Sequence, residues 1–193
     1  MSLVLGKQEM TGGKDFSNEK PTEDQHVAIC IGVWDIGIHE SVWEGKVSQK
    51  RKLLIRFEVE ELMPEDSEYK GKHKCINRYF NATLWEQGAL RPAIEAIIGK
   101  ALTQEEAEQL DLQSLVGKAC MLDIIHKTRN GKVIPEIKAI SKIPKKMEAD
   151  IFTPDNLYKD GKEPEWLEKV KAKAIAPAPA PIAEDDDDEP LPF

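Results

Sequence analysis

The chain has 193 residues, 40% of them hydrophobic, which is enough for one domain with a buried core and polar tails. It carries 27 Lys+Arg against 35 Asp+Glu, a formal net charge of -8. No apolar run approaches the roughly 18 residues that a membrane span needs, and no signal-peptide core is present near the N-terminus. These features exclude a membrane-spanning helix, and we expect a cytoplasmic protein with no membrane partner.

The charge is unevenly distributed along the chain. Residues 27–147 hold 19 Lys+Arg and 17 Asp+Glu, a net of +2, whereas six acids lie together in residues 184–189. Cys30, Cys75 and Cys120 form no CxxC pair, which predicts buried reduced thiols rather than disulfides or a zinc site. The four histidines share no ligand spacing, so we expect neither a metal nor a cofactor.

The first predicted strand begins at Val27. Val27, Ile29, Ile31 and Val33 alternate, and Ile36 and Ile38 continue the apolar set one residue out of step. A β-bulge across Trp34-Asp35, flanked by Gly32 and Gly37, explains the change of phase. The second strand has Leu53, Ile55, Phe57 and Val59 on its core face and Lys52, Leu54, Arg56 and Glu58 on the other.

A third strand spans roughly residues 74–84, and a helix follows it. Thr83 to Glu86 fits a capping box, but Pro92 requires either a start near Gly88 or a kink. Leu90, Ile94 and Ile97 have helical spacing, and Thr103 to Glu106 is a second capping box that opens a short helix. Residues 119–127 and 133–143 form a hairpin around the turn pair Asn130-Gly131.

This order of elements predicts a mainly β protein with a five-stranded OB-fold barrel and a helix between strands 3 and 4. Residues 1–25 are expected to be a disordered arm, and residues 26–147 the barrel. Residues 148–175 hold a loop and a short helix that begins at Pro164 and packs on the barrel through Trp166 and Val170. Residues 176–193 form an Ala-Pro spacer and an acidic tail.

Cations and aromatic rings concentrate in the strands and turns that an OB-fold uses to bind single strands. Of Tyr79 and Phe80, one should face the core and one the groove, and the ring of Trp34 is expected to face outward. The alternative for the cations is a solvated polar face, and for each ring core packing. The predicted nucleic-acid-binding residues are Trp34, Trp43, Lys46, Lys50, Arg51, Lys52, Arg56, Lys72, Lys74, Arg78, Tyr79, Phe80, Lys127, Arg129 and Lys132.

Several short motifs, in this order along residues 27–171, resemble a family of bacteriophage single-stranded DNA-binding proteins with an OB-fold. They are Asp35-Ile36-Gly37, residues 50–60, Arg78-Tyr79, residues 89–100, residues 115–118 and residues 164–169. The C-terminal sequence EDDDDEPLPF is separately similar to the acidic tip of bacterial single-stranded DNA-binding proteins. The resemblance implies a role in DNA replication and recombination, and a tail that binds partner proteins.

The sequence therefore predicts a phage single-stranded DNA-binding protein that is not an enzyme. The acids of its C-terminal tail would compete with DNA for the basic face, and the tip of the tail would recruit replication or recombination proteins. The predicted partner-binding residues are Asp187, Asp188, Glu189, Pro190, Leu191, Pro192 and Phe193. The alternatives are a protein–protein adaptor on an OB scaffold, a single-strand annealing protein and, for the tail, a solubilising segment. Edge strands could also pair copies of the chain into a homo-oligomer.

Overall fold

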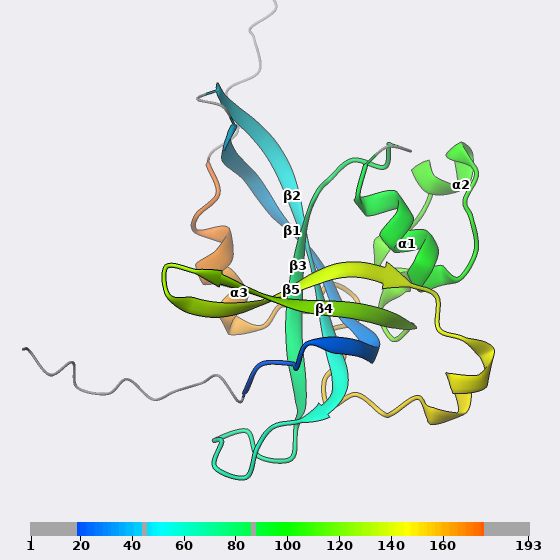
Figure 1. The fold of residues 1–193 in the computed structure, drawn as a ribbon. Helices are drawn as coiled ribbons and strands as arrows, with labels where there is room; N and C mark the ends of the chain where they lie inside the picture. Colours follow the sequence, from blue (N-terminus) through cyan, green and yellow to red (C-terminus); the bar gives the residue numbers. More distant parts are fainter. Residues whose placement is uncertain (1–18, 44–45, 86–87, 176–193) are drawn as a thin grey trace, which may run out of the picture.

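Five strands form a single antiparallel sheet in the computed structural model, which describes residues 19–43, 46–85 and 88–175 (Figure 1). The strands are β1 (Asp24–Trp43), β2 (Lys46–Leu62), β3 (His73–Asn81), β4 (Ala119–Arg129) and β5 (Lys132–Ser141). Their order in the sheet is β3-β2-β1-β4-β5. The predicted mainly β class with five strands is confirmed. The hydrogen bonds do not close the sheet, so β3 and β5 are its edges.

The three α-helices of the described residues lie on two sides of this sheet. α1 (Leu90–Ile98) and α2 (Gln104–Glu108) follow β3, together with the 3-10 turn η2 (Leu112–Leu115). After β5 come a second 3-10 turn, η3 (Lys145–Asp150), and α3 (Glu165–Lys171). Figure 1 shows α1 and α2 on one side of the strands and α3 on the other.

β1 bends at the two glycines that the sequence places there. Its register with β2 shifts between Cys30 and Gly32 and again between Asp35 and Gly37. Gly37 has a φ of +84°, which a residue with a side chain adopts only at a cost. The single predicted bulge is therefore two irregularities, and β1 can pair with β4 at its start and with β2 along the rest of its length.

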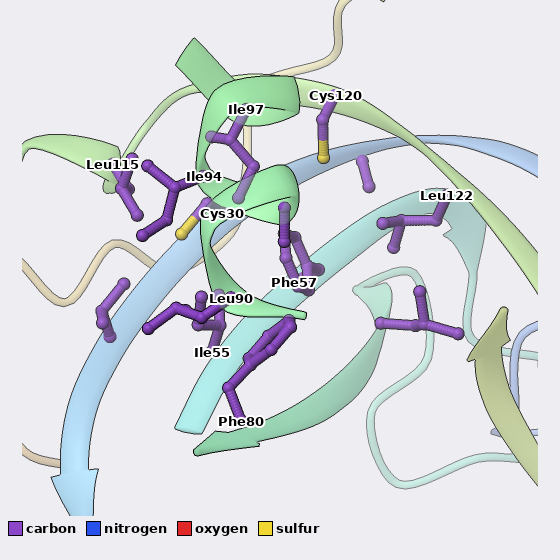
Figure 2. Packing of buried hydrophobic residues seen from close by; sticks show 14 of the residues in the cluster. Cys30, Ile55, Phe57, Phe80, Leu90, Ile94, Ile97, Leu115, Cys120 and Leu122 are labelled. Atoms are coloured by element: carbon purple, nitrogen blue, oxygen red, sulfur yellow. The ribbon is translucent and has the colours of Figure 1, made fainter. Parts of the chain in front are cut away.

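The main core lies between α1 and the concave side of the sheet (Figure 2). Leu90, Ile94 and Ile97 of α1 are buried in the same cluster as Ile55 and Phe57 of β2, which are fully buried. The helical spacing in α1 and the alternation in β2 predicted that these side chains face the core. Burial of each such side chain contributes about 1.5–3 kcal/mol to folding.

Two boundaries differ from the sequence prediction. The third strand ends at Asn81 rather than near residue 84, and α1 begins at Leu90 with Ala89 at its N-cap. Thr83 therefore does not cap this helix. Pro92 falls in the first turn, where its missing N–H has no helical acceptor to lose, so the helix has no kink. The second capping box is confirmed, because Thr103 and Glu106 exchange both hydrogen bonds.

The β4–β5 hairpin turns at Asn130-Gly131, as predicted. Both residues have positive φ, +51° and +73°, which is the geometry of a tight two-residue hairpin turn. The N-terminal residues of the described chain connect the two edge strands of the sheet. Lys20 Nζ donates to Val133 O in β5, and the Lys20 carbonyl accepts from Lys74 Nζ in β3.

Candidate nucleic-acid interface

The convex side of β1, β2 and β3, which faces away from α1, is called here the outer face. Trp34, Leu54 and Tyr79 are direct register partners across the three strands, so their side chains form one row on this face. The first two are buried, whereas Tyr79 is 53% exposed. The outer face is therefore covered over β1 and β2 and open over β3.

The cover consists of residues 152–175, called here the covering segment. Leu167 of α3 is fully buried in a small cluster with Trp34, Ile36 and Leu54. Trp166 and Val170 pack at the edge of this cluster, as the sequence predicted for the docking of this helix. The helix begins at Glu165 with Pro164 at its N-cap, one residue later than expected.

Trp34 is not available as a stacking surface in this structure, which corrects the prediction that its ring faces outward to solvent. It does leave the main core, as its phase indicated, but it is only 3% exposed beneath the covering segment. Its Nε1 donates to Lys162 O at 2.9 Å, and its ring makes edge contacts with Tyr158 and Trp166, at centroid distances of 5.4 and 5.6 Å.

A buried carboxylate attaches the covering segment to β2. Glu58 is fully buried and accepts hydrogen bonds from Asp155 N at 2.7 Å and Asn156 Nδ2 at 3.1 Å. Asp155 in turn accepts from His73 N at 2.5 Å and lies 3.0 Å from His73 Nδ1. Partial burial raises the pKa of Asp155, but these hydrogen bonds outweigh it and hold the pKa below its usual range.

Glu58, His73 and Asp155 also bring metal-ligating atoms within 4.8 Å of one another. N–H groups of the protein already occupy these oxygens, so hydrogen bonding within the fold accounts for the arrangement. These contacts give no positive indication of a metal.

The burial of the two neighbouring rings of β3 shows which one faces the core. Phe80 is 3% exposed and belongs to the main core, so its prediction as a binding residue is wrong. Tyr79 points to the opposite side. Arg78 lies on the same side of the strand as Phe80, with its guanidinium 5.1 Å from the Phe80 ring centroid. Burial lowers the pKa of Arg78, against the opposing charge of Glu136 in β5.

Several predicted binding cations are already engaged within the protein. Lys74 is buried and bonds to Glu61, which removes it from a solvent-facing groove and corrects that prediction. Arg51 pairs with Asp35, and Arg56 lies 4.7 Å from the Trp166 ring centroid and donates to Asn77. At the β4–β5 turn, Lys127 and Arg129 both pair with Glu136. Exposed pairs of this kind contribute about 0–1 kcal/mol and can exchange partners.

Other predicted cations are not paired with an acid among the described residues. Lys46, Lys50, Lys72 and Lys132 are exposed, and the Lys52 ammonium donates to Asn81 Oδ1 at 2.7 Å. In the view of Figure 1, the β1–β2 hairpin and the β4–β5 turn both project toward the side of α3. Trp43 belongs to β1, but the position of its side chain lies outside what the structure describes, as do the tail residues 187–193.

A cavity of about 310 Å³ opens beside the exposed ring on β3 and is called here the Tyr79 notch. It spans the outer face from β1 to β3 and ends against the covering segment. None of its lining residues is acidic. They are Ile36, His39, Lys52, Tyr79, Val170 and Lys173.

No family model and no curated protein matches this chain. Among the described residues, no helix is long and apolar enough to cross a membrane.

The predicted binding residues did not include four residues that line the notch: Ile36, His39, Val170 and Lys173. Val170 was expected only to dock the helix, and Lys173 follows α3 in a stretch with no strand or turn signal. The available signal was the basic end of α3, where Lys169, Lys171 and Lys173 follow one another at alternate positions.

Proposed function

We propose that the protein binds single-stranded DNA without strong sequence preference, through the part of the outer face that the covering segment leaves open. The observation that carries this proposal is an exposed tyrosine ring near the end of β3, Tyr79, which lines one cavity together with Lys52 of β2. Rings that stack on bases and cations that follow the phosphates are the two requirements of such binding.

The finer architecture belongs to the same proposal. A strongly bent β1, three strands before the helix and a hairpin after it support an OB-fold barrel in which β3 and β5 lie near each other without backbone pairing. Strands 2 and 3 of that fold carry the oligonucleotide face. The motif resemblance adds a phage protein of replication and recombination, working in the host cytoplasm without enzymatic activity.

The acidic tail has two proposed roles. Six consecutive acids are a polyanion that competes with DNA for the lysines of the β1–β2 hairpin. The final Leu191, Pro192 and Phe193 present a ring and the terminal carboxylate to replication or recombination proteins. Both roles rest on the sequence and on the charge of the body.

Direct binding tests the proposal. Fluorescence anisotropy of a labelled oligo-dT at low salt should show saturable binding by the full chain, with weaker binding to a duplex of equal length. The absence of binding to oligo-dT would overturn it. Anisotropy of the labelled oligonucleotide does not depend on which tryptophan it meets: Trp34 is buried and Trp166 partly so, whereas Trp85 is 74% exposed.

A second candidate function, a protein–protein adaptor, is favoured by the internal pairing of Arg51, Arg56, Lys74, Lys127 and Arg129. In that case the barrel only supports the tail. A chain that binds no oligonucleotide at low salt but retains a tail-dependent protein partner would favour the adaptor.

A further inference from the structure

We propose that the end of α3 is part of the DNA interface, and that the Tyr79 notch holds one base of the strand between the Tyr79 ring and the wall made by Val170. The proposal rests on the proposed function and names its subsite. It assigns a binding role to the covering segment, which otherwise only packs on the sheet.

The first step concerns the point on the outer face at which the covering segment ends its contact with the strands. In the row across the sheet, Trp34 and Leu54 are buried beneath Leu167, whereas their neighbour Tyr79 is half exposed. Val170, one helical turn after Leu167, lines the notch that contains Tyr79. The helix therefore ends its contact with the sheet at the position where the exposed ring begins.

The second step concerns size and polarity. A volume of about 310 Å³ lies at the small end of ligand cavities and suits one flat ring rather than a large ligand. The sides are apolar or aromatic, from Ile36, Val170 and Tyr79, which is the surface on which a base stacks without sequence preference.

The third step concerns charge. Lys52 of β2 and Lys173 beyond α3 lie at the notch, and no acidic residue lines it. Lys52 is held by a neutral partner, Asn81 Oδ1, rather than by a carboxylate. Within the described part of the chain neither ammonium group is held by a carboxylate, so both can bind phosphates on either side of a seated base. The larger cavity at the base of the hairpin differs, because Asp35 lines it and pairs with Arg51.

Matched variants test the assignment. Tyr79→Ala should weaken oligo-dT binding about 5- to 150-fold, the range for one stacked base, and Tyr79→Phe should restore it. The control is Tyr69→Ala, since Tyr69 is equally exposed but lies outside the notch. Lys173→Ala should lower the slope of log K against log salt by about 0.7, one phosphate contact on a single strand. Lys169→Ala, in α3 but outside the notch, should not change the slope.

An oligonucleotide with abasic sites separates stacking from a general loss of structure. Tyr79→Ala should cost nothing on the abasic strand, whereas Lys173→Ala should keep its full effect. If wild-type protein binds oligo-dT but Tyr79→Ala and Lys173→Ala behave like their controls, the notch assignment is overturned and the proposed function stands. If wild-type protein does not bind at low salt, both fail.

Discussion

A single glycine positions the buried tryptophan of the outer face. A Cβ built on Gly32 would lie 2.2 Å from the Trp34 ring, so the indole occupies the space of the missing side chain. The glycine is required here for close approach, not for backbone conformation. The two glycines in the sequence predicted a bulge, but not that the indole lies against Gly32, because that contact depends on how the covering segment packs.

Gly32→Ala should therefore destabilise the protein by about 1–3 kcal/mol, the usual cost of overpacking. Urea unfolding measures this loss. In a Trp34→Leu background the same substitution should cost clearly less, because the ring that it meets is gone. Equal costs in both backgrounds would mean that the indole does not lie over Gly32.

His26 makes stability depend on pH. Its Nδ1 lies 3.1 Å from Glu60 and its Nε2 3.0 Å from Thr22 O, so the protonated ring can donate to both. The hydrogen bond with Glu60 raises the pKa of His26 above its usual value, although burial opposes this, and Glu61 adds a smaller effect in the same direction. The stabilisation is complete below the unfolded pKa of about 6.5 and is lost as the pH rises through the folded pKa.

The free energy of unfolding should accordingly fall as pH rises above about 6.5. Glu60→Gln should flatten this dependence, because it removes the charge that favours the protonated ring. Glu68→Gln, in the β2–β3 loop, serves as the control. An unchanged pH profile in Glu60→Gln would show that this pair does not set the pKa.

At the scale of elements, the covering segment is attached by hydrogen bonds as well as by packing. Glu58 accepts from Asp155 and Asn156, Tyr158 N donates to Ile31 O, and Ile175 N donates to Ile38 O. The contacts run from the middle of β1 to the base of the β1–β2 hairpin. The segment is therefore an integral part of the outer face.

Glu58→Ala should remove the buried acceptor of two hydrogen bonds, from Asp155 N and Asn156 Nδ2, at a cost of about 1–3 kcal/mol. Hydrogen exchange of the Tyr158 amide should become faster, since the segment loses its attachment at Asp155. Glu65→Ala, an exposed acid of the β2–β3 loop, should affect neither quantity. Slow exchange at Tyr158 in Glu58→Ala would show that packing alone holds the segment.

The elements could be predicted to the extent that each carries a local signal. Alternation identified β2, the Asn130-Gly131 pair identified the hairpin, and helical spacing identified the buried side of α1. The landing place of α3 could not be predicted, because a seven-residue helix with one apolar side fits any apolar surface. The position of α3 on the sheet determines which of the candidate rings are exposed. Trp34 became covered, and Tyr79 did not.

The ion pairs could not be predicted from the sequence either. Lys74 and Glu61 are brought together by the β2–β3 hairpin, and Arg51 and Asp35 by the β1–β2 register. A count of cations per strand could not separate these from Lys46 and Lys50. Among the described residues, the predicted cations that are not paired with an acid are therefore fewer than the sequence prediction: Lys46, Lys50, Lys52, Lys72 and Lys132.

At the scale of the whole molecule, the account depends on the relation between a body with free lysines and a tail with six consecutive acids. If both compete for one surface, removal of the tail should leave DNA affinity equal or higher, most clearly at low salt, where charge–charge competition is strongest. Partner recruitment by the tip would be lost in the same variant.

The most direct test is a salt titration of oligo-dT binding for the full chain and for the chain truncated after Ala183. With about four phosphate contacts, log K should fall against log salt with a slope of about -3, or about 50-fold between 50 and 200 mM. The truncated chain should bind at least as tightly at low salt, and the two curves should converge as salt increases. A flat salt response, or loss of binding on truncation, would contradict the account.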